Sequence, residues 1–191
     1  MLFTTPRSLI FIAVITLFLQ GCAALVVGAG VGAASAAHDR RTLGTQLDDK
    51  TATARLAAKF ANNANLDVAR IDITVFNGIV LLVGQAPSES IKEEVSTTAQ
   101  NVENLRKIHN QMRIAEPIPA TVIANDTWLA SKVKTALIGD KRVDGLNIIV
   151  EVEDSEVFLM GLVSSSEADV AVEVARNVNG VARVIKAFEN N

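Results

Sequence analysis

Residues 71–84 read Ile-Asp-Ile-Thr-Val-Phe-Asn-Gly-Ile-Val-Leu-Leu-Val-Gly. Two apolar, largely β-branched runs flank Asn77-Gly78, and Asn-Gly between such runs is the strongest short-range signal of a β-hairpin. Sliding the sequence by 77 places superposes Ile71–Val75 on Ile148–Val152 and Val80–Gly84 on Val157–Gly161. The second hairpin turn is then Asp154-Ser155. The chain therefore contains two copies of one unit.

Each copy has one helical pattern before its hairpin and another after it. Asp49 and Asp126 are expected to be the N-caps of the first helices, because an aspartate side chain accepts hydrogen bonds from the free N–H groups of a helix start. The first of these helices has Ala54, Ala57, Ala58 and Ala61 on one side, and the second has Leu129, Val133, Ala136 and Leu137 toward the core. The later helices are expected at about 88–102 and 165–178, the second opened by a Ser164/Glu167 capping box.

A strand closes each copy, at 105–114 and at 181–188. The order α-β-β-α-β predicts an α+β fold with two tandem domains, each a three-stranded mixed sheet with two helices on one face. The other sheet face also carries apolar residues, at Leu81, Val83, Phe158 and Met160. Either the two domains pack together through these faces, or a partner protein covers them.

The N-terminus has the pattern of a lipoprotein signal peptide. Arg7 precedes an uncharged apolar run, and Leu19-Gln20-Gly21-Cys22 resembles the lipobox, with the only Cys of the chain at the acylated position. We expect cleavage after residue 21 and lipidation of Cys22, and two or more acyl chains give a stable anchor. Ala23 and Ala24, in place of an aspartate, indicate the outer membrane with periplasmic domains. The alternative is an uncleaved membrane helix, since residues 8–37 carry no charge.

Composition excludes several function classes. A 49% hydrophobic content and a formal charge of -3 exclude a disordered acidic tail and a basic nucleic-acid-binding module. One Cys and two His cannot form a Cys/His zinc site, and neither His38 nor His109 has a nucleophile nearby in the sequence. The acidic cluster at 151–156 lacks the EF-hand spacing. We therefore expect no catalytic residue, metal or cofactor, and a protein that is not an enzyme.

The repeated unit resembles a known domain. A hairpin ending in V-x-L-x-G and the closing Val178-Asn179-Gly180-Val181 resemble the BON domain, a bacterial lipid-binding module, although Val102-Glu103-Asn104-Leu105 of the first copy lacks the glycine. Together with the lipobox, the chain is similar to dual-BON outer-membrane lipoproteins. The expected parts are a signal peptide (1–21), a lipidated flexible tether (22–47), a first BON domain (48–115), a Pro-containing linker (116–124) and a second BON domain (125–191).

This resemblance implies a non-enzymatic protein that binds anionic phospholipid through its second domain. It also implies a role in outer-membrane integrity, concentration at the division site and a link to the β-barrel assembly machinery. Nucleic acid and small-molecule substrates are not expected partners. Two alternatives remain open: a protein-interaction scaffold for envelope or assembly factors, and a hemolysin-like membrane-lytic protein, since some relatives carry that label.

The first helix of the second copy carries the candidate lipid site. A lone Trp beside basic side chains suits a headgroup interface, because indole buries its rings while its N–H stays hydrated. Residues 126–142 are locally +2, with Lys132, Lys134, Lys141 and Arg142 against Asp126 and Asp140. The expected lipid-binding residues are Trp128, Ser131, Lys132, Thr135, Ile138, Lys141 and Arg142. The first copy has Thr51 in place of Trp128. The competing interpretation is that Trp128 packs on Pro119 or Ile123 of the linker.

Overall fold

The computed structural model describes residues 39–190. The expected signal peptide, Cys22, the alternative membrane helix and the tether up to His38 lie outside the described residues. The first half contains α3 (Leu43–Ala61), the 3-10 helix η2 (Ala64–Val68), β1 (Arg70–Phe76), β2 (Ile79–Ala86), α4 (Glu89–Gln100), β3 (Lys107–Asn110) and β4 (Arg113–Ile114). The second contains α5 (Ala120–Gly139), the 3-10 helix η3 (Gly145–Asn147), β5 (Ile149–Glu153), β6 (Glu156–Val163), α6 (Ser165–Arg176) and β7 (Arg183–Asn190).

The two sheets have the same mixed topology. β1 pairs antiparallel with β2 and β3 pairs parallel with β2, while β5, β6 and β7 repeat that arrangement. The α+β fold of two tandem α-β-β-α-β units is confirmed. The first sheet has a fourth strand, because β4 also pairs with β2 after a break in the expected strand 105–114. At the break, Asn110 Oδ1 accepts from the Met112 N–H at 3.1 Å, and the Met112 side chain enters the core.

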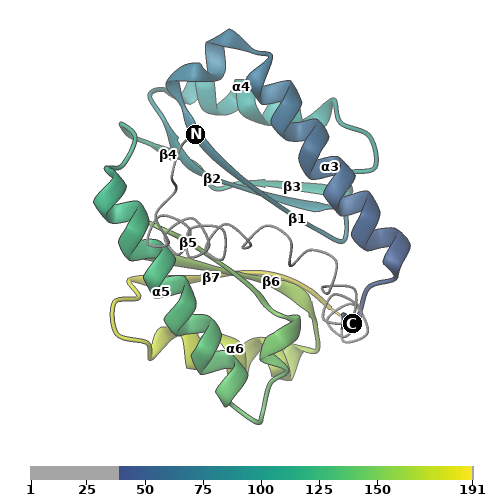
Figure 1. Cartoon of the computed structure of the whole chain (residues 1–191), viewed down its shortest axis with the longest axis vertical. Coiled ribbons are helices and arrows are strands. Elements are labelled where there is room, and N and C mark those ends of the chain that lie inside the picture. Colours follow the sequence, from purple (N-terminus) through teal and green to yellow (C-terminus); the bar gives the residue numbers. More distant parts are fainter. Residues whose placement is uncertain (1–38, 191) are drawn as a thin grey trace, which may run out of the picture. The chain divides into compact units, whose positions relative to one another are not determined.

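Helices cover only one face of each sheet. α3 and α4 lie over the first sheet, and α5 and α6 lie over the second (Figure 1). Leu56 and Phe60 of α3 meet Val80 and Leu82 of β2 in one core. The second core is built in the same way from Leu129, Val133, Val157 and Leu159.

The helix-free faces of the two sheets pack against each other. A third apolar cluster joins Phe76, Ile79, Leu81 and Val83 of the first half to Phe158 and Met160 of the second, and all six are buried. Polar contacts surround this cluster. The Arg70 guanidinium pairs with the buried Glu153 carboxylate at 2.6 Å, and Arg106 pairs with Glu189. The expectation that the two domains pack through these faces is confirmed.

Asp49 and Asp126 are not helix N-caps, which corrects the expectation from the sequence. The N-caps are Thr42, whose Oγ1 accepts from the Thr45 N–H, and Pro119, which has no side-chain cap. Both aspartates are buried, each as the seventh residue of its helix. Asp49 accepts from the N–H groups of Asn77 and Gly78 at 2.6 and 2.8 Å.

Asp126 binds the second hairpin turn in the same way. It accepts from the N–H groups of Asp154 and Ser155 at 2.7 and 2.9 Å. Both turn residues have positive φ, 48° and 64°, as do Asn77 and Gly78 in the first turn. Because this turn leaves two N–H groups pointing at the helix, a carboxylate there satisfies both. The shared aspartate therefore fixes the first helix of each unit to its hairpin.

The first helices also begin earlier than expected. α3 begins at Leu43 and α5 at Ala120, so residues 43–47 of the expected tether and 120–124 of the expected linker are helical. The alanine side of α3 faces solvent, with Ala54, Ala57, Ala58 and Ala61 all exposed. Its core side is Ala52, Leu56 and Phe60, in line with the buried Asp49. The Ser164/Glu167 capping box is present as predicted.

Candidate functional site

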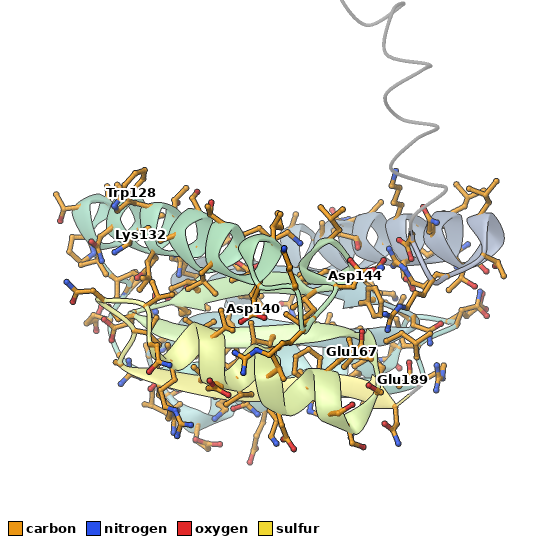
Figure 2. The ribbon with its side chains drawn as sticks, turned by 90° about the horizontal axis from the view of Figure 1, so that it is seen from below. Trp128, Lys132, Asp140, Asp144, Glu167 and Glu189 are labelled. Carbon is orange, nitrogen blue, oxygen red and sulfur yellow. The ribbon has the colours of Figure 1, made fainter. Side chains whose placement is uncertain are left out.

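The outer face of α5 carries the expected lipid-contact side chains. Leu129, Val133 and Leu137 are buried, so the residues on the opposite side of the helix face solvent. There, Trp128 and Ile138 are 64% and 50% exposed, and Ser131 and Thr135 are also exposed. Figure 2 shows Trp128 on the outer side of the helix, with Lys132 closer to the strands. Trp128 is thus too exposed to be packed against Pro119 or Ile123, the competing interpretation from the sequence.

The hydroxyl groups on this face are already hydrogen-bonded within the helix. Thr127 Oγ1 donates to the Ile123 carbonyl at 2.9 Å, Ser131 Oγ to the Thr127 carbonyl at 3.0 Å, and Thr135 Oγ1 to the Ser131 carbonyl at 2.8 Å. Such back-bonding leaves no hydroxyl donor that needs water. Removing a satisfied hydroxyl from water costs less than removing a free one. The outer face of α5 is therefore better suited to an apolar medium than its sequence indicates.

The basic side chains near this face are mostly engaged. Lys132 Nζ donates to the Asn179 carbonyl at 2.7 Å. Lys134 Nζ donates to the carbonyls of Gly145, Leu146 and Ile148 at 2.9, 3.2 and 2.5 Å, and burial lowers the pKa of this ammonium. Lys134 therefore supports the 145–148 turn and does not present its charge to a ligand.

Arg142 is also paired. Its guanidinium contacts Asp140 at 2.8 Å and Glu173 at 3.4 Å, and the Arg142 hydrogen bonds lower the pKa of the Asp140 carboxyl to about 2. Lys141 is exposed and forms no ion pair with residues 39–190. The local charge of +2 is thus carried mainly by Lys141 and the partly exposed Lys132, while Arg142 is neutralised by its neighbours.

Leu146 is a candidate contact residue that the sequence reasoning missed. It is 57% exposed in η3, beside the end of α5. Gly145 places it there, since a Cβ on Gly145 would lie 2.3 Å from the Leu137 carbonyl carbon. The only sequence signal was an apolar residue after Asp144-Gly145, which is also common in buried turns.

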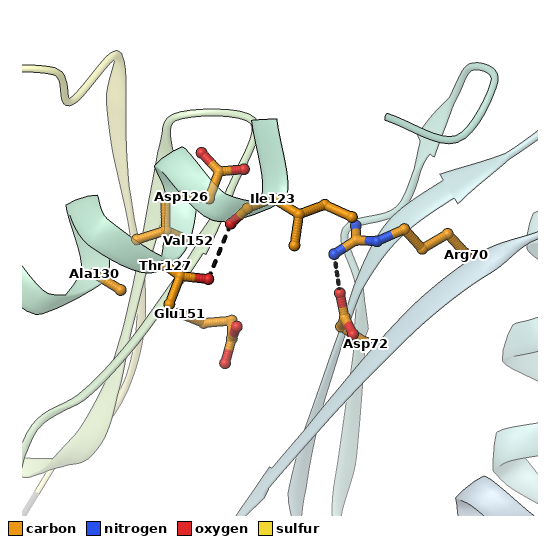
Figure 3. Close-up of a pocket in the computed structure, with 8 residues that line it drawn as sticks. All are labelled: Arg70, Asp72, Ile123, Asp126, Thr127, Ala130, Glu151 and Val152. Carbon is orange, nitrogen blue, oxygen red and sulfur yellow. Dashed lines mark hydrogen bonds and ion pairs between the residues drawn. The ribbon is translucent and has the colours of Figure 1, made fainter. Parts of the chain in front are cut away.

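A cavity of about 270 Å³ lies beside α5, between the two halves. Its lining is Arg70, Asp72, Ile123, Asp126, Thr127, Ala130, Glu151 and Val152 (Figure 3). Arg70 already pairs with Asp72 and Glu153. Burial raises the pKa of the Glu151 carboxyl, and Thr74 Oγ1 donates to Glu151 Oε2 at 3.1 Å. The charged groups of this cavity therefore already have partners, and the Arg70–Glu153 and Thr74–Glu151 contacts join the halves.

In the part of the chain that the structure describes, side chains that could act in catalysis or bind a metal ion do not lie together. Within residues 39–190, no group of three or more His, Cys, Asp and Glu side chains is arranged to hold a metal ion. His109 lies on β3, where burial and then the nearby Lys107 charge lower its imidazole pKa. His38 lies outside the described residues. None of the helices within residues 39–190 combines the length and apolar character that a membrane span requires.

Comparison with known proteins gives the family. The BON domain matches residues 48–116 and 125–189. The chain is 37% identical over 175 residues to "Outer membrane lipoprotein DolP" of Haemophilus influenzae, covering 91% of each chain. It is 40% identical over 151 residues to the "21 kDa hemolysin" of Actinobacillus pleuropneumoniae, covering 78% of each. It is 28% identical over 145 residues to "Osmotically-inducible protein Y" of Escherichia coli, covering 74% of this chain and 72% of that protein.

The repeated fold and these matches define the class of protein. The chain belongs to the BON-domain family, as a dual-BON outer-membrane lipoprotein. It is held at the outer membrane by a lipid anchor with its domains facing the periplasm. This is not a known enzyme family.

Proposed function

We propose that the second BON domain binds the surface of an anionic phospholipid membrane through the outer face of α5, and that the protein has no catalytic role. Trp128 and Ile138 enter the interface, and Ser131 and Thr135 lie between them. Lys132 and Lys141 meet the headgroups, with the carboxylate-paired Arg142 beside them. Cys22 carries the covalent lipid anchor. Bilayer attachment at Cys22 and at α5 keeps the domains close to the outer membrane and supports its integrity.

One observation carries this proposal: Trp128 stands 64% exposed on a helix face whose hydroxyl groups are hydrogen-bonded internally. Burying an aromatic side chain contributes about 1.5–3 kcal/mol. Lys132 and Lys141 add about 1 kcal/mol each near an anionic surface. Because the two contributions are similar, we expect salt to weaken binding without abolishing it.

The test uses residues 39–191, which form one compact unit. Trp128 is the only Trp of the chain, so its fluorescence reports its own environment. We expect a blue shift with phosphatidylglycerol vesicles and a smaller one with phosphatidylcholine vesicles. Trp128→Glu should abolish co-sedimentation with the anionic vesicles, whereas Thr97→Glu, which adds the same charge on the exposed side of α4, should not. Unchanged sedimentation of the Trp128 variant would refute the proposal.

A scaffold for envelope proteins or for the β-barrel assembly machinery is a second candidate. Its main support was the apolar sheet face, but that face is buried between the two halves. The resemblance of the sequence to dual-BON lipoproteins is what supports this role and concentration at the division site. Co-purification and imaging of the full chain with Trp128→Glu test both: retained partners would show a protein contact that does not depend on lipid.

Membrane lysis is suggested by the name of the A. pleuropneumoniae relative. Residues 39–190 contain no helix long and apolar enough to cross a bilayer. Dye release from loaded vesicles checks this directly. We expect residues 39–191 to bind without releasing dye, and rapid release would favour the lytic function.

A further inference from the structure

The start of α3 exposes two large apolar side chains. Leu43 and Leu47 are 69% and 65% exposed, more than any other large hydrophobic residue within residues 39–190. They lie four residues apart and therefore share one side of the helix. Thr51, Ala54 and the charged Lys50 continue this exposed side. The apolar bulk of the outer side of α3 therefore lies at its N-terminal end.

This exposed turn is firmly held. Arg41 Nη1 donates to Asp49 Oδ2 at 2.6 Å, and the Arg41 guanidinium carbon lies 4.1 Å from the centre of the Phe76 ring. Arg40 binds the second half, through the Glu167 carboxylate at 2.7 Å and the Leu162 carbonyl at 2.9 Å. The exposure of the two leucines is therefore a fixed feature of the fold.

The start of α3 lies on the same side of the molecule as the outer face of α5. Asp144, two residues before the exposed Leu146, follows the end of α5. Figure 2 shows α3 and α5 along the same side of the two halves, with Asp144 between them. The exposed apolar residues of α3 and of α5 therefore lie on one side of the molecule (Figure 2).

We propose that Leu43 and Leu47 are a second membrane-contact site, so that both BON domains lie on the bilayer surface. The inference rests on the proposed function, since it extends the α5 face. Cys22 precedes Asp39 by 17 residues, and a chain of that length reaches at most roughly 60 Å. An anchor at Cys22 therefore keeps Leu43 near the bilayer at a high effective concentration. A lipid surface is the occupant that this attachment provides.

This second contact differs from the first in its chemistry. Arg40 and Arg41 are both paired with carboxylates, and Asp48 beside Leu47 is exposed. The α3 site therefore presents two apolar side chains with one exposed cation, Lys50, and one exposed carboxylate, Asp48. Because these two charges offset each other, the site should insert about equally into zwitterionic and anionic lipid, whereas the α5 face should prefer anionic lipid.

The test uses the full lipidated chain in vesicles that contain brominated phosphatidylcholine and phosphatidylglycerol, because bromine quenches tryptophan at the depth of the acyl chains. The native chain reports on Trp128. Moving the single Trp, in Trp128→Phe/Leu47→Trp, reports on α3, and Trp128→Phe/Thr97→Trp is the matched control on α4. We expect emission loss at position 47 comparable to that at Trp128, and none at position 97. Residue 47 is exposed, so thermal unfolding should confirm that the variants fold.

The outcomes separate the two proposals. Quenching of Trp128 with no quenching at position 47 overturns the second site and leaves the proposed function intact. No quenching of Trp128 refutes the proposed function, and quenching at position 47 alone then keeps α3 as the membrane contact. If position 47 is unquenched and Leu43→Ser/Leu47→Ser converts a dimer to a monomer in sedimentation, the leucines bind a second copy instead, which also overturns the second site.

Discussion

Thr74 and Glu151 occupy equivalent positions in the two halves and contact each other. Thr74 Oγ1 donates to Glu151 Oε2 at 3.1 Å, and the residues are 77 positions apart, the offset of the sequence repeat. Equivalent residues meet in this way when two copies pack face to face around an approximate twofold axis. The contact therefore lies near the approximate twofold axis that relates the two BON domains, where the carboxylate is partly buried.

The stability of this interface should depend on pH through Glu151. Burial raises the pKa of its carboxyl above the ordinary value of 4.5, and the Thr74 hydrogen bond only partly opposes this. Between 4.5 and the raised pKa, the folded state holds a proton that the unfolded state has lost. The free energy of unfolding should therefore fall as pH rises through that window and stay lower above it.

Glu151→Gln removes this dependence, since the amide keeps an acceptor for Thr74 without a charge. We expect the variant to be more stable than the native chain at pH 7, by about 1.4 kcal/mol for each pH unit between 4.5 and the raised pKa, and equally stable at pH 3. Urea unfolding at the two pH values measures this. Glu93→Gln, on the exposed side of α4, is the control. A native chain more stable than Glu151→Gln at pH 7 would contradict the prediction.

Loss of the buried aspartate should release the hairpin turn of the second domain. Asp126→Ala leaves the N–H groups of Asp154 and Ser155 without their acceptor. Each buried orphan donor costs about 1–3 kcal/mol, so a loss of roughly 3 kcal/mol is expected in chemical unfolding. Asn125→Ala changes the exposed neighbour and should have little effect. Equal stability of the two variants would show that the carboxylate does not hold the turn.

The two hairpin turns differ at their second central residue, which is Gly78 in the first domain and Ser155 in the second, so each can be replaced by the other's residue. Ser155 has φ of 64°, a conformation that costs a residue with a Cβ about 1–2 kcal/mol, whereas the first turn has Gly78 at 73°. Ser155→Gly should raise the thermal midpoint. Gly78→Ser should lower it, because its Cβ would lie 3.1 Å from Arg106 Cγ and 3.3 Å from the Asn104 carbonyl oxygen. If both variants shifted the thermal midpoint in the same direction, strain from the positive φ of a residue with a Cβ would be excluded as the cause.

The fold could be predicted from the sequence wherever a local rule was decisive. Asn77-Gly78, the apolar run of β2 and the Ser164 capping box each have one dominant structural meaning, and each is confirmed. Asp49 and Asp126 were assigned to helix starts because aspartate is common there. Their true partners are N–H groups 28 and 29 residues away, a relationship that local patterns do not contain.

The candidate site was predictable in part for the same reason. Helical periodicity placed Trp128 and Ile138 on the exposed side of α5, as the structure has them. Counting charges overstated the basic character of this face, because the sequence cannot show that Lys134 binds three carbonyl groups or that Glu173 approaches Arg142. The exposed leucines of α3 were missed because residues 43–47 were assigned to a tether.

Gly84, the glycine of the V-x-L-x-G motif, should not tolerate a side chain. A Cβ there would lie 2.0 Å from the Arg70 carbonyl oxygen, across the β1–β2 pairing, and φ is 123°. Gly84→Ala must displace backbone and should cost about 3 kcal/mol or more in urea unfolding. Gly139, at the end of α5, offers open space, because a Cβ added there would meet nothing within 4 Å. Gly139→Ala should therefore leave stability unchanged or raise it by up to about 1 kcal/mol.

Glu167 should report whether the start of α3 is docked on the second domain. The Arg40 hydrogen bond, followed by the Ser164 N–H, lowers the pKa of this carboxyl from 4.5 to about 2. Since the folded pKa is depressed, its contribution to stability is complete above 4.5 and is lost as pH falls toward 2. Carboxyl NMR titration of the native chain should give the low value.

Arg40→Ala should raise the Glu167 pKa toward 4.5 but not fully to it, because the capping hydrogen bond from Ser164 remains. Arg176→Ala, at the other end of α6, is the matched control and should leave the titration unchanged. Faster amide hydrogen exchange at residues 41–46 should accompany the Arg40 change, since Arg40 joins that turn to the second half. A Glu167 pKa near 2 in the Arg40 variant would show that the cap alone sets it and that the start of α3 is not held there.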